Sequence, residues 1–148
     1  MNIKSRQGGM ALIEVMIAVI VLAIGVLGAV GLQARSLSAL SNAGARVDAT
    51  IAAERAIGLM WTDQANFATY AWNSTGGPAP AALANWFADT QAVLPNATAA
   101  ITVTPIAGSN ASLVSVTLTW QRRTGASGDK NADQLNTHTI VATVAPLD

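Results

Sequence analysis

The chain contains no cysteine, and this absence excludes disulfide bonds, thiolate metal sites and cysteine nucleophiles. Charge is also scarce: charged residues make up 11% of the sequence, and eight basic residues balance eight acidic ones. A neutral chain offers no general electrostatic attraction to nucleic acid. The only histidine, His138, has neither a cysteine nor a second histidine with which to build a zinc site.

Sequence patterns of catalysis are missing as well. The chain has no nucleophile elbow, no glycine-rich phosphate loop and no pair of carboxylates placed for acid–base chemistry. Asp129 and Asp133, with Asn131 between them, have a spacing faintly similar to that of calcium ligands. The rest of the calcium loop pattern and its glutamate are absent, so a solvated turn is expected there. We predict a protein that is not an enzyme, with no catalytic residues, no metal and no cofactor.

What the chain does have is apolar residues, which make up 51% of it and gather near the N-terminus. Lys4 and Arg6 make the first nine residues, MNIKSRQGG, positively charged. An unbroken run of 18 apolar or glycine residues extends from Val15 to Leu32. As a helix this run is about 27 Å long, close to the thickness of one bilayer core. The positive leader predicts a cytoplasmic N-terminus, with the rest of the chain pointing outward.

Two common explanations of such a segment fit it incompletely. A secretory signal peptide has an apolar core of ~7–15 residues followed by a cleavage site with small residues. This run is longer, and the nearest Ala-x-Ala, at Ala43 and Ala45, lies well beyond it. A single-pass anchor explains the run but neither Gly8-Gly9 nor Glu14, a carboxylate in its first turns. A charge within hydrocarbon is expensive and indicates function, unless Glu14 lies at the interface among the lipid headgroups.

The string Gly9-Met-Ala-Leu-Ile-Glu14, after a short basic leader, resembles the signature of type IV prepilins. This resemblance implies that a prepilin peptidase cuts after Gly9 and methylates the new amine of Met10, a position where phenylalanine is commoner. Glu14 matches the acidic residue of the family, whose usual partner is the terminal amine of a neighbouring subunit. A paired carboxylate is far less costly in an apolar core than a lone one. We therefore expect Glu14 to set the register of assembly.

The sequence after the signature, Ala23-Ile-Gly-Val-Leu-Gly-Ala-Val-Gly-Leu-Gln33, is similar to that of the minor pilin group PilV, the type IV pilus modification proteins. Minor pseudopilins of type II secretion systems share the same start and are the alternative. The resemblance implies a role in pilus biogenesis, with twitching motility, adhesion or DNA uptake downstream. Its expected partners are the prepilin peptidase, other pilin and minor pilin subunits, and inner-membrane lipid. The basic patch of Arg122, Arg123 and Lys130 is too small to predict DNA binding. An uncut, membrane-anchored periplasmic binding module remains a third possibility.

Three glycines, Gly25, Gly28 and Gly31, interrupt the apolar run. Glycine allows membrane helices to approach one another closely. It also weakens a helix by about 1 kcal/mol relative to alanine, and pilin filaments often loosen a stretch of this helix. Both interpretations stay open on the sequence alone.

The remainder predicts an α+β, pilin-like fold. One helix is expected from about Ala11 to Met60, with Leu40, Val47 and Ile51 on the apolar face of a second half that packs on a head domain. The elements expected in the head are a helix over Ala81–Val93 and antiparallel strands over Ala99–Ile106, Leu113–Gln121 and His138–Val144. In the middle strand Val114, Val116, Leu118 and Trp120 share one face, which is expected to lie on the long helix.

The expected organisation has four parts. Residues 1–9 form the leader peptide, and residues 10–32 form the transmembrane and filament-core part of the helix. Residues 33–61 form its amphipathic part, and residues 62–148 form the globular head. The expected location is the bacterial inner membrane, with a single span, a cytoplasmic N-terminus and a periplasmic head, followed by the pilus filament after assembly.

Overall fold

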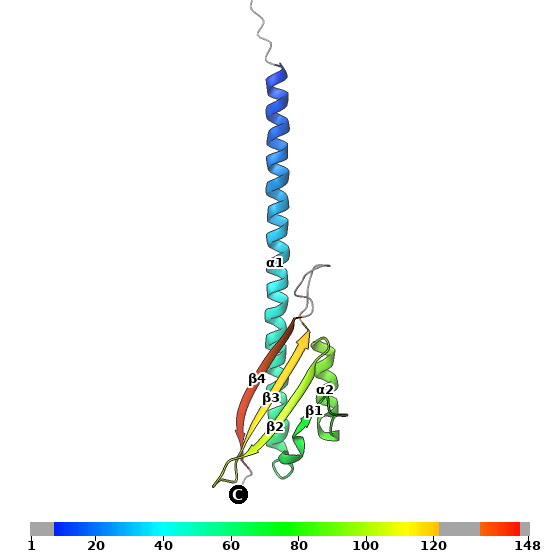
Figure 1. Cartoon of the computed structure of the whole chain (residues 1–148), viewed down its shortest axis with the longest axis vertical. Coiled ribbons are helices and arrows are strands. Elements are labelled where there is room, and N and C mark those ends of the chain that lie inside the picture. The colour runs from blue at the N-terminus through cyan, green and yellow to red at the C-terminus, as the bar shows by residue number, and fades with distance from the viewer. Residues whose placement is uncertain (1–7, 122–133, 146–148) are drawn as a thin grey trace, which may run out of the picture. The chain divides into compact units, whose positions relative to one another are not determined.

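The computed structural model describes residues 8–121 and 134–145. The elements follow one another as helix α1 (Gly8–Thr62), the 3-10 helix η1 (Phe67–Tyr70), β1 (Trp72–Asn73), α2 (Ala81–Val93), β2 (Thr98–Pro105), β3 (Ser112–Gln121) and β4 (Leu135–Val144) (Figure 1). A long helix packed on a small antiparallel sheet is the pilin-like α+β architecture, so the predicted fold class is confirmed.

The chain divides into two compact units, residues 1–37 and residues 38–148. Within the first unit the structure describes only helix, and every side chain from Ala11 to Leu37 is exposed. The second unit contains the C-terminal part of α1 together with all the strands and α2. All the buried residues of the core belong to this second unit.

The described strands form one sheet in the order β1-β2-β3-β4, and each is antiparallel to its neighbour. The register is regular: Val116 of β3 lies between Ile101 of β2 and Ile140 of β4. A tight turn joins β2 to β3, closed by a 3.0 Å hydrogen bond from the Ile106 amide to the Ala111 carbonyl. Gly108 adopts a φ of +78° there, a conformation that is strained for other residues.

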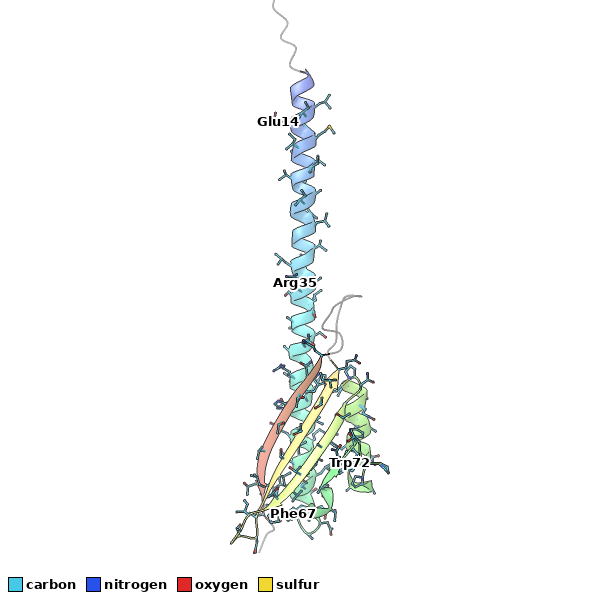
Figure 2. All side chains as sticks on the ribbon, in the orientation of Figure 1. Glu14, Arg35, Phe67 and Trp72 are labelled. Atoms are coloured by element: carbon cyan, nitrogen blue, oxygen red, sulfur yellow. The ribbon has the colours of Figure 1, made fainter. Side chains whose placement is uncertain are left out.

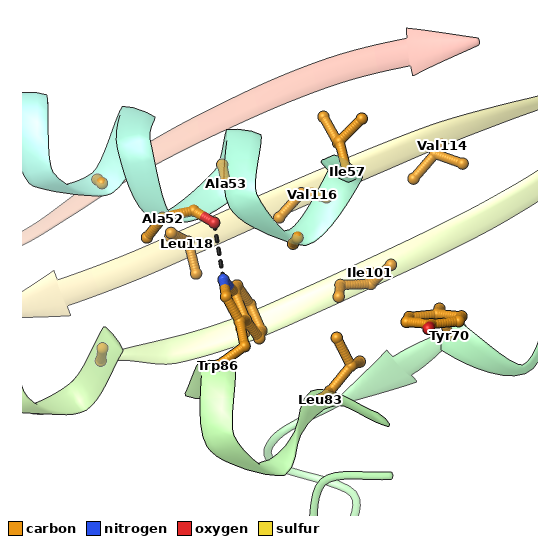
Figure 3. Packing of buried hydrophobic residues seen from close by; sticks show 14 of the residues in the cluster. Ala52, Ala53, Ile57, Tyr70, Leu83, Trp86, Ile101, Val114, Val116 and Leu118 are labelled. Atoms are coloured by element: carbon orange, nitrogen blue, oxygen red, sulfur yellow. Dashed lines mark hydrogen bonds between the residues drawn. The ribbon is translucent and has the colours of Figure 1, made fainter. Parts of the chain in front are cut away.

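The core of the head lies between one face of the sheet and an alanine-rich face of α1 (Figure 3). Small side chains allow the helix backbone to come close to the strands, and alanine loses no side-chain entropy on burial. The helix contributes Ala45, Ala49, Ala52, Ala53, Ala56, Ile57 and Met60 to the core, and β3 contributes Val114, Val116, Leu118 and Trp120. All four of these β3 side chains are completely buried, which confirms the face predicted for this strand.

The apolar face predicted for this part of α1 is wrong. Leu40, Val47 and Ile51 were expected to pack on the head, yet their exposed fractions are 70%, 58% and 51%. The face was predicted from hydropathy, which is highest for large aliphatic side chains. Close packing of a helix on a sheet instead favours small side chains. The alanines take the inner face, so the large side chains are left on the outside of the head.

The other elements differ from expectation mainly at their ends. Helix α2 has the predicted bounds, whereas β4 begins at Leu135, three residues before the predicted start at His138. The short strand β1 was not expected at all. It pairs only Trp72 with Ile101 and Asn73 with Ala100, and two residues show no periodicity that a sequence pattern could reveal.

Candidate processing and assembly site

Glu14 lies on α1 within an uncovered apolar surface (Figure 2). The large side chains around it, from Leu12 to Leu22, are all more than half exposed. No ion pair or hydrogen bond to Glu14 occurs within the described part of the chain. The described residues therefore provide neither a partner for this carboxylate nor cover for the apolar side chains beside it. Both needs point to surroundings outside the chain, such as lipid or other subunits.

Helix α1 is long and apolar enough to cross a membrane, judged by length and composition. The most apolar stretch of the segment Ala11–Thr62 has no buried residue. This exposure separates it from the core helix of a soluble domain, which hides most of its apolar surface. The helix therefore fits membrane anchoring at its N-terminal part.

Gly9 and Met10, the residues that would flank a processing site, fall in the first turn of α1. Gly25, Gly28 and Gly31 lie in the exposed part of the same helix, as do Val15 and Leu32 at the ends of the apolar run. A Cβ atom added at any of these three glycines would meet nothing within 4 Å. Nothing within the chain therefore requires glycine there. The two interpretations, close packing on a neighbour and local loosening, both stay predictions.

The single histidine, His138, forms a hydrogen bond with Thr50. Nε2 of His138, on β4, lies 3.2 Å from Oγ1 of Thr50 on α1, and the side chain is half-buried. This hydrogen bond links the edge of the sheet to the helix. Within the described ranges no group of three histidine or acidic side chains is placed to hold a metal ion. The residues Asp129, Asn131, Asp133, Arg122, Arg123 and Lys130 lie outside the described residues.

A groove between α1 and α2 has no counterpart in the sequence-based predictions. An exposed ion pair, with Nη2 of Arg55 3.3 Å from Oδ2 of Asp89, divides it into two open hollows. Their volumes are about 350 and 500 Å³, and Ile51 and Val93 line the first while Trp86 lines the second. Exposed ion pairs contribute about 0–1 kcal/mol, so the pair has little effect on stability. No periodic signal relates residues 34 positions apart, and the sequence therefore did not reveal the groove.

Comparison with known proteins bears on the N-terminal part of the chain. Residues 4–30 match the family model described as the prokaryotic N-terminal methylation motif. The matched stretch contains Gly9, Met10 and Glu14. The match supports a type IV pilin-like family. No curated protein and no solved structure matches the chain.

The motif and the fold lead to the same class of protein. The N-terminal methylation motif supports a substrate of the prepilin peptidase, of the pilin or pseudopilin type, that assembles with other pilin-like subunits. It also indicates a structural subunit rather than an enzyme. The exposed apolar helix is in keeping with both membrane anchoring and later incorporation into a filament.

Proposed function

We propose that this chain is a minor pilin of the PilV type, processed by the prepilin peptidase and then built into, or used to prime, a type IV pilus. The N-terminal methylation motif over residues 4–30 is the observation that carries this proposal. Processing removes residues 1–9 by cutting after Gly9 and methylates the amine of Met10. Pilus biogenesis is the direct role, and twitching motility, adhesion or DNA uptake are its downstream consequences.

Glu14 serves assembly in this proposal. Cutting creates a positive amine at Met10, four residues before the carboxylate, and a neighbouring subunit can bring its own amine to Glu14. Burying a charge pair of this kind in an apolar filament core costs far less free energy than burying a lone carboxylate. The exposed, unpaired state of Glu14 within the described chain supports this role.

The two faces of α1 give further support to assembly. The alanine face is covered by the head, so the large side chains Leu40, Val47 and Ile51 remain on the outside. A row of exposed apolar side chains along one helix face supports an interaction site there. In the proposed organisation residues 1–9 are the leader, residues 10–32 cross the inner membrane or enter the filament core, residues 33–61 link the span to the head, and residues 62–148 form the periplasmic head.

The experiment is to follow the mature chain into filaments sheared from cells. Wild type is expected in the sheared fraction, whereas Gly9→Val is expected to remain uncut in the membrane because the peptidase requires glycine before the scissile bond. Gly8→Ala is the matched control and is expected to behave as wild type. If Gly9→Val were cut and assembled as well as wild type, the proposed processing site would be wrong.

The runner-up is a minor pseudopilin of a type II secretion system, which shares the same processing and helix packing. Two deletion strains separate the two roles: one lacks the pilus assembly ATPase and the other the secretion ATPase. The proposal expects loss of the sheared chain only in the pilus mutant. Loss of secreted proteins after deletion of this chain, with pili unchanged, would favour the pseudopilin. An uncut chain in all strains would leave a membrane-anchored binding module.

A further inference from the structure

Strand β4 is an open edge of the sheet. It is the last strand in the order β1-β2-β3-β4, and each of its residues from Leu135 to Val144 pairs with β3 in an unbroken antiparallel register. Within the described ranges, the backbone of β4 has hydrogen-bond partners only on β3. About half of its amide and carbonyl groups point away from β3, because the direction of these groups alternates along an antiparallel strand. These groups can pair with one more strand.

The edge at β4 lacks the features that usually protect an edge strand. Edge strands of soluble proteins are commonly short or bulged, or carry proline or charged side chains. Strand β4 has ten residues in continuous register, and it contains no proline and no Asp, Glu, Lys or Arg. The opposite edge, β1, has only two residues, and Trp72 packs edge-on against Phe87 of α2 with ring centres 4.9 Å apart. Of the two edges, only β4 is long enough to serve as a template for another strand.

The core is open on the same side. Val114 and Val116 of β3 are fully buried, whereas their register partners on β4, Ala142 and Ile140, are only half-buried. On the other side of β3, Ile101 of β2 is buried. A strand added beside β4 would cover Ile140 and Ala142 while it paired with the free backbone groups. The incomplete backbone ladder and the incomplete apolar cover therefore lie at one place.

Helix α1 places two opposite charges beside this edge. Thr50 lies 3.2 Å from His138 of β4, and Arg46 and Glu54 lie one turn before and one turn after Thr50 on the same row of the helix. Both side chains are exposed, and neither has an ion-pair partner in the described part of the chain. They are about 12 Å apart along the helix axis, close to the roughly 13–14 Å that four residues span in a strand. The row therefore matches two opposite charges placed four residues apart on one face of an added strand.

We propose that β4 docks one extended strand of a different polypeptide, which runs antiparallel to β4 and carries a basic residue followed, four positions later, by an acidic one. Strand β4 and α1 run in the same direction (Figure 1), so an antiparallel strand passes Glu54 before Arg46. The basic side chain then meets Glu54 and the acidic side chain meets Arg46. Backbone pairing supplies the binding, and the two charges select the sequence and its direction.

A second copy of this chain does not have the required strand. None of the described strands carries Asp, Glu, Lys or Arg, so none of them can place a charge beside Arg46 or Glu54. Strand β1 could approach β4 in the antiparallel sense, but its two residues span less than the distance between the two charges. The charges therefore identify the partner as a strand from another protein.

Two synthetic ten-residue peptides of equal composition test the docking. Both alternate threonine with valine, and two valines four positions apart are replaced by lysine and then glutamate in the first peptide, and by glutamate and then lysine in the second. Binding to the full-length chain in detergent is measured by fluorescence anisotropy. The lysine-first peptide is expected to bind roughly tenfold more tightly, because the reversed order turns two attractions into two repulsions. Equal affinities would overturn the proposed role of the charges, and no binding of either peptide would overturn the docking edge.

A charge exchange on the chain provides the matched test. The double variant Arg46→Glu/Glu54→Arg is expected to reverse the preference, so that the glutamate-first peptide binds more tightly. Arg55→Gln is the control, since Arg55 lies on the α2 side of the helix, and it is expected to keep the original preference. An unchanged preference in the double variant would show that the peptides do not lie beside Arg46 and Glu54.

Hydrogen exchange of the backbone amides shows where the peptide binds. In the free chain, amides that alternate along β4 are expected to exchange quickly, and the lysine-first peptide is expected to slow them at least tenfold. The amides of β3, which has a strand on each side, should be unaffected and serve as the internal control. Slowed exchange elsewhere with β4 unchanged would contradict the inference. This edge belongs to the unit of residues 38–148, so the result does not depend on whether residues 1–9 are removed.

Discussion

Tyr70 is buried in the core, and the carboxylate of Asp63 lies next to its hydroxyl. It is the only tyrosine of the chain, its exposed fraction is 4%, and its hydroxyl donates a 3.2 Å hydrogen bond to Oδ2 of Asp63. Burial raises the pKa of Tyr70 above its ordinary value of 10.0, and the hydrogen bond and the negative charge of Asp63 raise it further. The neutral phenol is thus favoured in the folded chain.

This raised pKa predicts an alkaline dependence of stability. The stabilisation is fully present below the ordinary pKa of tyrosine, and it is lost as the pH rises through the pKa of the folded state. Titration of the tyrosinate absorbance should give a midpoint above 10.0 in the folded chain and near the ordinary value in urea. Asp63→Asn should lower the folded midpoint only in part, because burial remains. A midpoint equal in folded and unfolded chains would contradict the account.

Trp86 joins α2 to α1 through a single buried hydrogen bond. Its indole Nε1 donates to the Ala52 carbonyl at 2.7 Å, and the side chain is 3% exposed (Figure 3). Trp86→Phe should lower the free energy of unfolding by about 1–2 kcal/mol, since the ring stays apolar but the hydrogen bond is lost. Urea unfolding of the full chain in detergent, followed by circular dichroism, measures the change. Trp61→Phe, at a 44% exposed position, serves as control and should stay within about 0.5 kcal/mol.

At the scale of single elements, α1 packs on the sheet through its alanine face. Ala53 is fully buried there, whereas Ala43 on the same helix is exposed. Ala53→Leu should destabilise the head by about 1–3 kcal/mol, because the extra atoms force the helix away from the sheet. Ala43→Leu introduces the same side chain where there is room and should change stability by less than about 0.5 kcal/mol. Equal thermal unfolding of the two variants would show that the face is not tightly packed.

Some of these elements could be predicted from the sequence and others could not. Helix α2 and the inward face of β3 were predicted correctly, because their patterns are regular and each element buries a single face. The inner face of α1 was not, since this helix has two apolar faces and hydropathy ranks Leu40 and Val47 above the alanines. Only the three-dimensional packing shows that small residues lie against the sheet. The strand β1 is too short to leave any pattern.

The candidate site has a clearer sequence signal than the contacts within the head, and its residue roles stay predictions. Glu14 stands out as one acid in a long uncharged run, and the Gly9–Met10 bond lies at a fixed distance before it. The groove between α1 and α2 and the link between His138 and Thr50 could not be predicted. Each joins residues that are far apart in the chain, 34 and 88 positions respectively for Arg55–Asp89 and Thr50–His138.

At the scale of the whole molecule, the two compact units differ in what they need from their surroundings. The unit of residues 38–148 has its own core, which includes Trp120, Leu118 and Met60 as fully buried side chains. Among the described residues, the N-terminal unit has no buried side chain, and its one carboxylate, that of Glu14, has no ion-pair partner. A folded head attached to an uncovered apolar helix is expected of a subunit that first sits in lipid and later packs against other helices.

The intact mass of the chain decides whether it is processed as a prepilin. The full chain is purified from cells with and without the prepilin peptidase, and both masses are measured. We predict that the chain loses residues 1–9 and gains one methyl group only where the peptidase is present. An uncut, unmethylated chain in both strains would contradict the account and leave a simple membrane anchor.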